Sequence, residues 1–143
     1  MNILIRNFVI RVNFIFNIIF FFFTALLLSS CDDTLTIEDI DKKPIPLTNV
    51  SFSQHIYPVL NVKCNYSGCH NDESRAGGVS LTNWSNVTDP RIVVRGDTTT
   101  SILVWSIDKI PGAKWMPPIN YPQLTKEQIR GIKTWIQEGA ENN

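Results

Sequence analysis

Hydrophobic residues follow two different patterns along this chain. Residues 12–28 form an almost unbroken apolar run rich in Phe, Ile and Leu, whereas the apolar residues after position 50 are interrupted by polar ones. Between residues 129 and 136 apolar side chains recur every three or four positions, which predicts one buried face of a helix. Thr125 and Gln128 precede this face at the spacing of a capping box, so we expect a helix that begins at Thr125 and ends near Gly139.

Shorter apolar stretches predict two further helices. We expect Ser53 to cap the entry to the first one and Pro58 to stand in the first turn of a helix over residues 58–64, because proline fits that position. Ser101 is the expected N-cap of the second helix, which continues through Ile107. Long polar segments rich in Gly, Asn and Asp separate these helices and predict loops.

Two cysteines and a histidine follow the first of these helices. Cys64, Cys69 and His70 have the order used to attach haem covalently, in which each thiol adds to a vinyl group and the histidine coordinates the iron. The usual motif has two residues between the cysteines and this chain has four, so we expect the extra residues to bulge outward at Gly68, since glycine tolerates a positive φ. The alternative is a disulfide between Cys64 and Cys69, with His70 an ordinary surface residue.

Met116 is the candidate for a second axial ligand of the iron. The chain has two methionines, and Met1 would leave with a signal peptide. Pro117 and Pro118 follow Met116 and stiffen its loop, which suits a weakly binding thioether. The alternatives are a core role for Met116, ligation by His55 instead, or an open or water-bound position.

The N-terminal apolar run has the features of an export signal. Arg6 and Arg11 provide a basic start, and the run ends on the small residues of Leu28-Ser29-Ser30-Cys31. We expect residues 1–30 to be a signal peptide. The last four residues resemble a bacterial lipobox, and that resemblance implies that Cys31 becomes the lipidated first residue of the mature protein. An uncleaved transmembrane anchor is the alternative; both place the rest of the chain on the exported side, in the periplasm or at the cell surface.

A polar segment and one domain follow the signal. We expect residues 31–50 to hold the lipidated cysteine and a flexible tether, whose span would be about 25 Å, and residues 51–143 to form the domain. Without residues 1–30 the chain has 11 basic and 13 acidic residues. This slightly acidic balance gives no indication of a nucleic-acid partner.

Residues 51–143 resemble class I c-type cytochrome domains, and more closely the cytochrome c-like domains named for planctomycetes. The resemblance covers nearly the whole domain, and only the cysteine spacing departs from it. The matching motifs are Ile56-Tyr57-Pro58, Cys64 to His70, Gly77-Gly78-Val79-Ser80-Leu81, Arg95-Gly96-Asp97, Ser101-Ile102-Leu103, Met116-Pro117-Pro118 and Trp135-Ile136-Gln137-Glu138-Gly139-Ala140.

The resemblance implies an all-α fold, with about four short helices wrapped around one haem and joined by long loops. It assigns Cys64, Cys69, His70 and Met116 to haem c binding, with His70 and Met116 as the iron ligands. It also implies that the first and last helices cross, and we expect Gly131 to allow their close approach.

Two other residues have two interpretations each. Trp84 is expected either in the core or against the haem. Arg95 is a candidate partner for a haem carboxylate, because a guanidinium can bind a carboxylate through two hydrogen bonds, and the alternative is a solvent-exposed arginine.

The sequence therefore favours a membrane-tethered electron carrier with one covalent haem and an unidentified redox protein as partner. No constellation of acid, base and nucleophile indicates an enzyme. Two alternatives are a haem-binding sensor or accessory module, in which a small ligand displaces Met116, and a haem-free surface domain held by a disulfide between Cys64 and Cys69.

Overall fold

The computed structural model describes residues 8, 11, 13–18, 20 and 35–143. The chain divides into two compact units, Met1–Thr34 and Leu35–Asn143. The described residues of the first unit are helical, and no helix within the described part of the chain is both long and apolar enough to cross a bilayer. Cys31 and most of the expected signal peptide lie outside the described residues.

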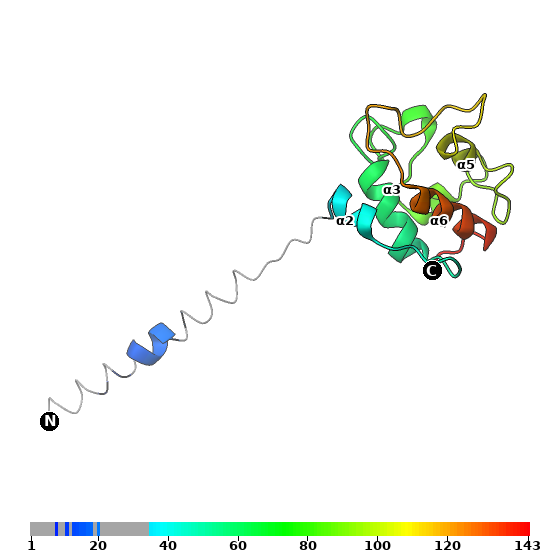
Figure 1. The fold of residues 1–143 in the computed structure, drawn as a ribbon. Coiled ribbons are helices and arrows are strands. Elements are labelled where there is room, and N and C mark those ends of the chain that lie inside the picture. The colour runs from blue at the N-terminus through cyan, green and yellow to red at the C-terminus, as the bar shows by residue number, and fades with distance from the viewer. Residues whose placement is uncertain (1–7, 9–10, 12, 19, 21–34) are drawn as a thin grey trace. The chain divides into compact units, whose positions relative to one another are not determined.

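The second unit consists of short helices joined by long loops (Figure 1). Residues 35–143 contain no strand, although Val94 and Asp97 form an isolated antiparallel bridge. This architecture confirms the expectation of a small helical domain with long loops. Its elements are α2 (Ile37–Lys42), the π-helix η1 (Phe52–Ile56), α3 (Tyr57–Lys63), the 3-10 helix η2 (Ala76–Gly78), α4 (Trp84–Val87), α5 (Ile102–Ile107) and α6 (Lys126–Gln137).

The closing helix α6 forms as its sequence pattern predicts. The Thr125 hydroxyl accepts a hydrogen bond from the Gln128 N–H at 3.2 Å, and the Gln128 side chain accepts one from the Thr125 N–H at 3.0 Å. This capping box satisfies backbone donors that the first turn would otherwise leave unpaired. The helix buries Ile132, Trp135 and Ile136, so its apolar face forms part of the hydrophobic core.

The first helical segment begins two residues earlier than expected. Ser51, rather than Ser53, is the N-cap, and its hydroxyl accepts a hydrogen bond from the Gln54 N–H at 3.2 Å. The Ser53 hydroxyl instead donates to the backbone carbonyl of Asn143 at 2.9 Å. Pro58 lies in the first turn of α3, as expected, because that position needs no N–H donor.

Residues 35–50 belong to this folded unit, which corrects the tether expected over residues 31–50. Ile40 in α2 and Ile45 and Val50 after it are each no more than 5% exposed. These apolar residues lie five positions apart, a spacing that matches neither a helix nor a strand, and the segment therefore had no recognisable period. The domain begins near Leu35 rather than at residue 51.

Side chains of α6 and its C-terminal end hold this N-terminal segment in place. The Glu127 carboxylate accepts a hydrogen bond from the Ile45 N–H at 3.0 Å, and the Glu138 carboxylate accepts one from the Val50 N–H at 2.9 Å. The Arg130 guanidinium donates to the Ile45 carbonyl at 2.6 Å. Because these partners come from the other end of the chain, no local sequence pattern could reveal them.

Gly131 marks a close approach between α6 and the N-terminal segment. A Cβ at this position would lie 2.6 Å from Cγ2 and 3.1 Å from Cδ1 of Ile45. The expectation of a close approach at Gly131 is confirmed, but the segment that approaches it is the one around Ile45 and not the first helix. The packing of α6 against η1 uses Trp135, whose ring centroid lies 5.3 Å from that of Phe52.

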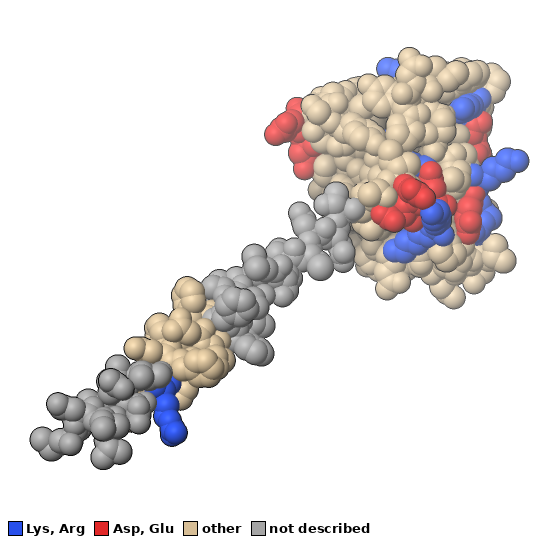
Figure 2. All heavy atoms as spheres, turned by 60° about the vertical axis from the view of Figure 1, so that its left-hand side comes forward, with Lys and Arg blue, Asp and Glu red and all other residues tan. Residues whose placement is uncertain are grey.

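Many charged side chains on the surface of the domain form ion pairs. Figure 2 shows basic and acidic groups next to one another on the face in view. Lys133 in α6, for example, donates to the Asp108 carboxylate at 2.6 Å and so ties α6 to the end of α5. Exposed pairs of this kind contribute little stability each, so the packing described above carries most of the fold.

We expect Gly131→Ala to lower the free energy of unfolding by about 1 kcal/mol, because overpacking costs about 1–3 kcal/mol and the gain in helix propensity is about 1 kcal/mol. In an Ile45→Ala background the same substitution should raise the free energy of unfolding, since the clash is gone. Denaturant titrations of the four proteins measure this cycle. A stabilising Gly131→Ala in the wild-type background would contradict the docking of residues 35–50 on α6.

Candidate functional site

A cavity of about 590 Å³ brings together the four residues that the sequence assigned to one site. Cys64, Cys69 and His70 line it from the segment after α3, and Met116 lines it from the loop between α5 and α6. Its volume is typical of a pocket for a ligand or cofactor. The remaining wall is mainly apolar and includes Leu60, Leu81, Ile92, Leu103, Ile107 and Leu124.

The four residues between the cysteines form a compact bulge. The His70 N–H donates to the Cys64 carbonyl at 3.1 Å, so the backbone closes directly across residues 65–69. Gly68 has φ 80°, and its N–H donates to the Ser74 hydroxyl at 2.8 Å. This confirms the expected bulge at Gly68, which lets both cysteines line the same cavity in spite of the longer spacing.

The two thiols are free and form no disulfide with each other. Desolvation, reinforced by the neighbouring Cys69, raises the pKa of the Cys64 thiol to about 12. Cys64 is therefore a neutral thiol at physiological pH, compatible with the apolar wall that it belongs to.

His70 is oriented by a backbone hydrogen bond on one ring nitrogen. Its Nδ1 lies 3.3 Å from the Val79 carbonyl oxygen. The tautomer with a proton on Nδ1 donates to this oxygen and leaves Nε2 as a lone-pair donor. The main chain is fixed as well, because the Leu81 N–H donates to the His70 carbonyl at 2.9 Å. A ligand histidine needs this combination of a set tautomer and a restrained ring.

Hydrogen bonds fix the backbone at Met116 and at the two residues that follow it. Its N–H donates to the Ser106 carbonyl in α5 at 3.0 Å. The Gln123 amide donates to the carbonyls of Pro117 and Pro118 at 3.3 and 2.9 Å. The loop therefore has few ways to move the thioether away from the cavity.

An aromatic contact joins the two loops that carry the site residues. The rings of Tyr66, in the cysteine segment, and Tyr121, beyond Met116, have centroids 6.4 Å apart. Tyr121 also lines the cavity. The positions of the two sides of the site are thus coupled through the Tyr66–Tyr121 pair.

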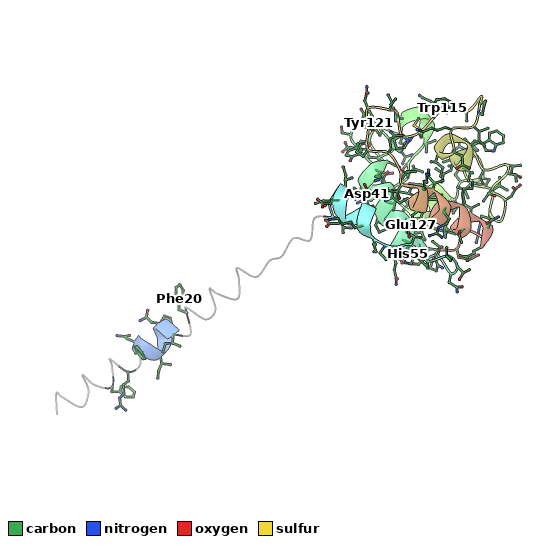
Figure 3. All side chains as sticks on the ribbon, in the orientation of Figure 1. Phe20, Asp41, His55, Trp115, Tyr121 and Glu127 are labelled. Carbon is green, nitrogen blue, oxygen red and sulfur yellow. The ribbon has the colours of Figure 1, made fainter. Side chains whose placement is uncertain are left out.

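His55, the rival ligand, lies away from this cavity. Its Nδ1 accepts a hydrogen bond from the Ser51 N–H at 3.0 Å, so the ring acts as a cap within η1. Figure 3 shows His55 at the opposite end of the domain from Tyr121. Burial, followed by the charge of Lys43, lowers the pKa of His55 below its usual value.

Trp84 and Arg95 also lie elsewhere. Trp84 donates its indole N–H to the Ala140 carbonyl at 2.8 Å, and the Arg95 guanidinium lies 5.5 Å from the Trp84 ring centroid. Arg95 is exposed and donates to the Glu141 carboxylate at 2.7 Å, so the structure supports the solvent-exposed alternative rather than a partner for a haem carboxylate. The cavity is instead lined by three other cations, Lys63, Arg91 and Lys114.

These three cations were missed because nothing local distinguishes them. Arg91 and Lys114 stand in loops, and Lys63 is the residue before Cys64 on an otherwise ordinary helix. Proximity to the motif was the available signal for Lys63. For Arg91 the sequence contains no signal, since the folding of loop 88–101 against the cavity brings it there.

The comparisons with known proteins add no assignment: no family model, curated protein or solved structure matches this chain. The geometry itself offers an imidazole and two thiols on one loop, a thioether on another, and apolar walls between them. Imidazole nitrogen and sulfur are atoms that bind transition metals, and the apolar walls would exclude water from a group held between them.

The pKa of His55 predicts a pH dependence of stability. The folded state favours neutral His55, so its pKa is lower in the folded than in the unfolded state. The contribution of His55 to the free energy of unfolding is therefore complete above the unfolded-state pKa of about 6.5, and it is lost as the pH falls through the lower folded-state pKa. We expect His55→Gln to remove this contribution while keeping an acceptor for the Ser51 N–H. Denaturant titrations from about pH 8 to about pH 5 measure the slope. Lys43→Gln should weaken the slope only in part, and equal slopes in wild type and His55→Gln would contradict the interpretation.

Proposed function

We propose that this chain is a membrane-tethered c-type cytochrome, which carries single electrons through one covalently bound haem. The observation that supports it is the convergence of Cys64, Cys69, His70 and Met116 on one apolar cavity. When bound, the haem supplies a one-electron couple at its iron. Everything else required of the protein is binding, orientation and exclusion of water.

The residues of the cavity fit this group. Free Cys64 and Cys69 are available for thioether bonds, and the free thiols favour attachment over the disulfide-held alternative. His70 presents Nε2 as a ligand because Nδ1 is engaged by the Val79 carbonyl. Lys114 is the cation in a loop of the wall that is available to a haem carboxylate, whereas the Arg91 guanidinium is already bound to the Asp89 carboxylate at 2.6 Å.

The fixing of Met116 favours electron transfer over sensing. A sensor needs a ligand that yields to a small molecule, whereas Met116 is restrained through Ser106 and Gln123. A thioether opposite an imidazole raises the haem potential relative to two imidazoles. A ligand set that stays unchanged between oxidation states also keeps the reorganisation on electron transfer small.

The proposed lipid attachment at Cys31 lies close to the folded unit in the sequence. With the folded unit beginning at Leu35, residues 32–34 are all that separates it from Cys31. The four steps from Cys31 to Leu35 span at most about 14 Å. If Cys31 is lipidated as we propose, the redox partner is met close to the surface of the envelope membrane rather than at the reach of a long tether.

We expect the mature protein, produced with a haem-attachment system, to retain haem on a denaturing gel. A peroxidase-based haem stain measures this, because only covalent haem survives denaturation. Cys64→Ser combined with Cys69→Ser should abolish the stain, since no thioether can form, and His55→Gln should leave it intact as the matched control. A wild-type band without stain would overturn the proposal. The two single cysteine variants report which thioether bonds form.

We expect Met116→Leu to keep the covalent haem but open one axial position. The variant should lose the methionine-to-iron charge-transfer band of the oxidised protein, bind carbon monoxide readily when reduced and have a lower reduction potential, because the thioether is absent. Visible spectroscopy and a carbon monoxide titration measure these changes. Ready binding of carbon monoxide by the wild type would instead favour the sensor alternative.

A further inference from the structure

A buried lysine stands in the cavity wall directly before the cysteine motif. The side chain of Lys63 is 0% exposed, and the residue lines the same cavity as Cys64 and Met116. A charged ammonium in such a position is costly unless it is paired and hydrogen-bonded. Its partners therefore indicate why the position is occupied by a lysine.

Lys63 binds two segments that come from distant parts of the chain. Its ammonium donates to Asp41 Oδ1 in α2 at 2.5 Å and to the Gln123 carbonyl oxygen at 2.6 Å. Asp41 in turn accepts from the Gln128 amide of α6 at 3.0 Å, and Figure 3 labels Asp41 on α2, which packs against α3. The buried charge thus has a counter-ion that the docked N-terminal segment supplies.

Gln123 connects this pair to the methionine loop. Its backbone carbonyl receives Lys63, while its side-chain amide donates to the carbonyls of Pro117, Pro118 and Tyr121. One residue therefore separates the ammonium from the backbone that follows Met116. The chain of contacts runs from Asp41 through Lys63 and Gln123 to the Met116 loop.

We propose that Asp41 is a positioning residue for Met116. It holds the Lys63 ammonium, which holds the Gln123 carbonyl, and Gln123 fixes the loop that presents the thioether to the cavity. The effect of this relay on iron ligation rests on the proposed haem function, whereas its effect on the loop does not. Through Asp41, the N-terminal segment thus helps to position the Met116 side of the site.

A merely structural role would have a different signature. An ion pair that only stabilises the fold can be replaced by neutral groups of similar volume with little loss of stability. A positioning role needs the donor to the Gln123 carbonyl, which such a replacement removes. The single variant Asp41→Asn and the double variant Asp41→Asn/Lys63→Met separate the two roles, and Glu38→Gln removes an exposed charge from the same helix as the control.

The first measurement is hydrogen exchange in the full-length mature protein, at the amides of Met116 and Tyr121. Met116 donates to the Ser106 carbonyl in α5, and Tyr121 donates to the Pro118 carbonyl within the loop. We expect about tenfold faster exchange in Asp41→Asn and in the double variant, the factor expected from losing one charge-assisted hydrogen bond. Glu38→Gln should exchange as wild type does. Unchanged exchange in both Asp41 variants would overturn the relay, whether or not the protein holds haem.

The second measurement is carbon monoxide binding by the reduced holoprotein. We expect both Asp41 variants to bind it about tenfold faster than wild type and Glu38→Gln, because Met116 leaves the iron more often. Thermal unfolding should recover in the double variant while the fast binding remains. Recovery of slow binding together with stability would show that the pair is only structural and overturn the proposal. A wild type without covalent haem would defeat the proposed function alone, since the exchange result stands apart from it.

Discussion

The site depends on holding two loops at a fixed separation across an apolar cavity. The two loops do not pack against each other across the cavity, so they gain no contact energy there. Their positions must be fixed by contacts with the rest of the domain. On one side the backbone closes from His70 to Cys64, and on the other the Met116 N–H is bonded to α5. The Tyr66–Tyr121 contact joins the two loops.

The N-terminal segment and the last helix supply much of this support. Residues 35–50 bury three aliphatic side chains and place their backbone N–H groups on carboxylates at the two ends of α6. Asp41 then reaches the Lys63 ammonium at the cavity wall. A small domain with a large cavity buries little apolar surface in its core. Docking the two ends of the chain together increases the buried area without lengthening the domain.

The chemistry of the cavity follows from how each donor is restrained. The His70 ring is set by a carbonyl on Nδ1, the Cys64 thiol is kept neutral by desolvation, and Met116 sits between an anchored N–H and two prolines. These restraints limit how far His70 and Met116 can move relative to the cavity. Small rearrangement is what an electron carrier requires, and it is the physical basis of our functional proposal.

Local patterns in the sequence were enough to locate α6 with its capping box, to place Pro58 in the first turn of α3, and to select Cys64, Cys69, His70 and Met116 as one group. Each of these depends on near neighbours in the chain or on side-chain chemistry, which a sequence displays directly. The docking of residues 35–50, the partner of Gly131, the distant position of His55 and the burial of Lys63 were decided by tertiary structure alone. The first, second and fourth of these involve residues far apart in the sequence. The position of His55 depends on the direction in which a short helix leaves its N-cap. A local hydrophobic period encodes neither kind of information.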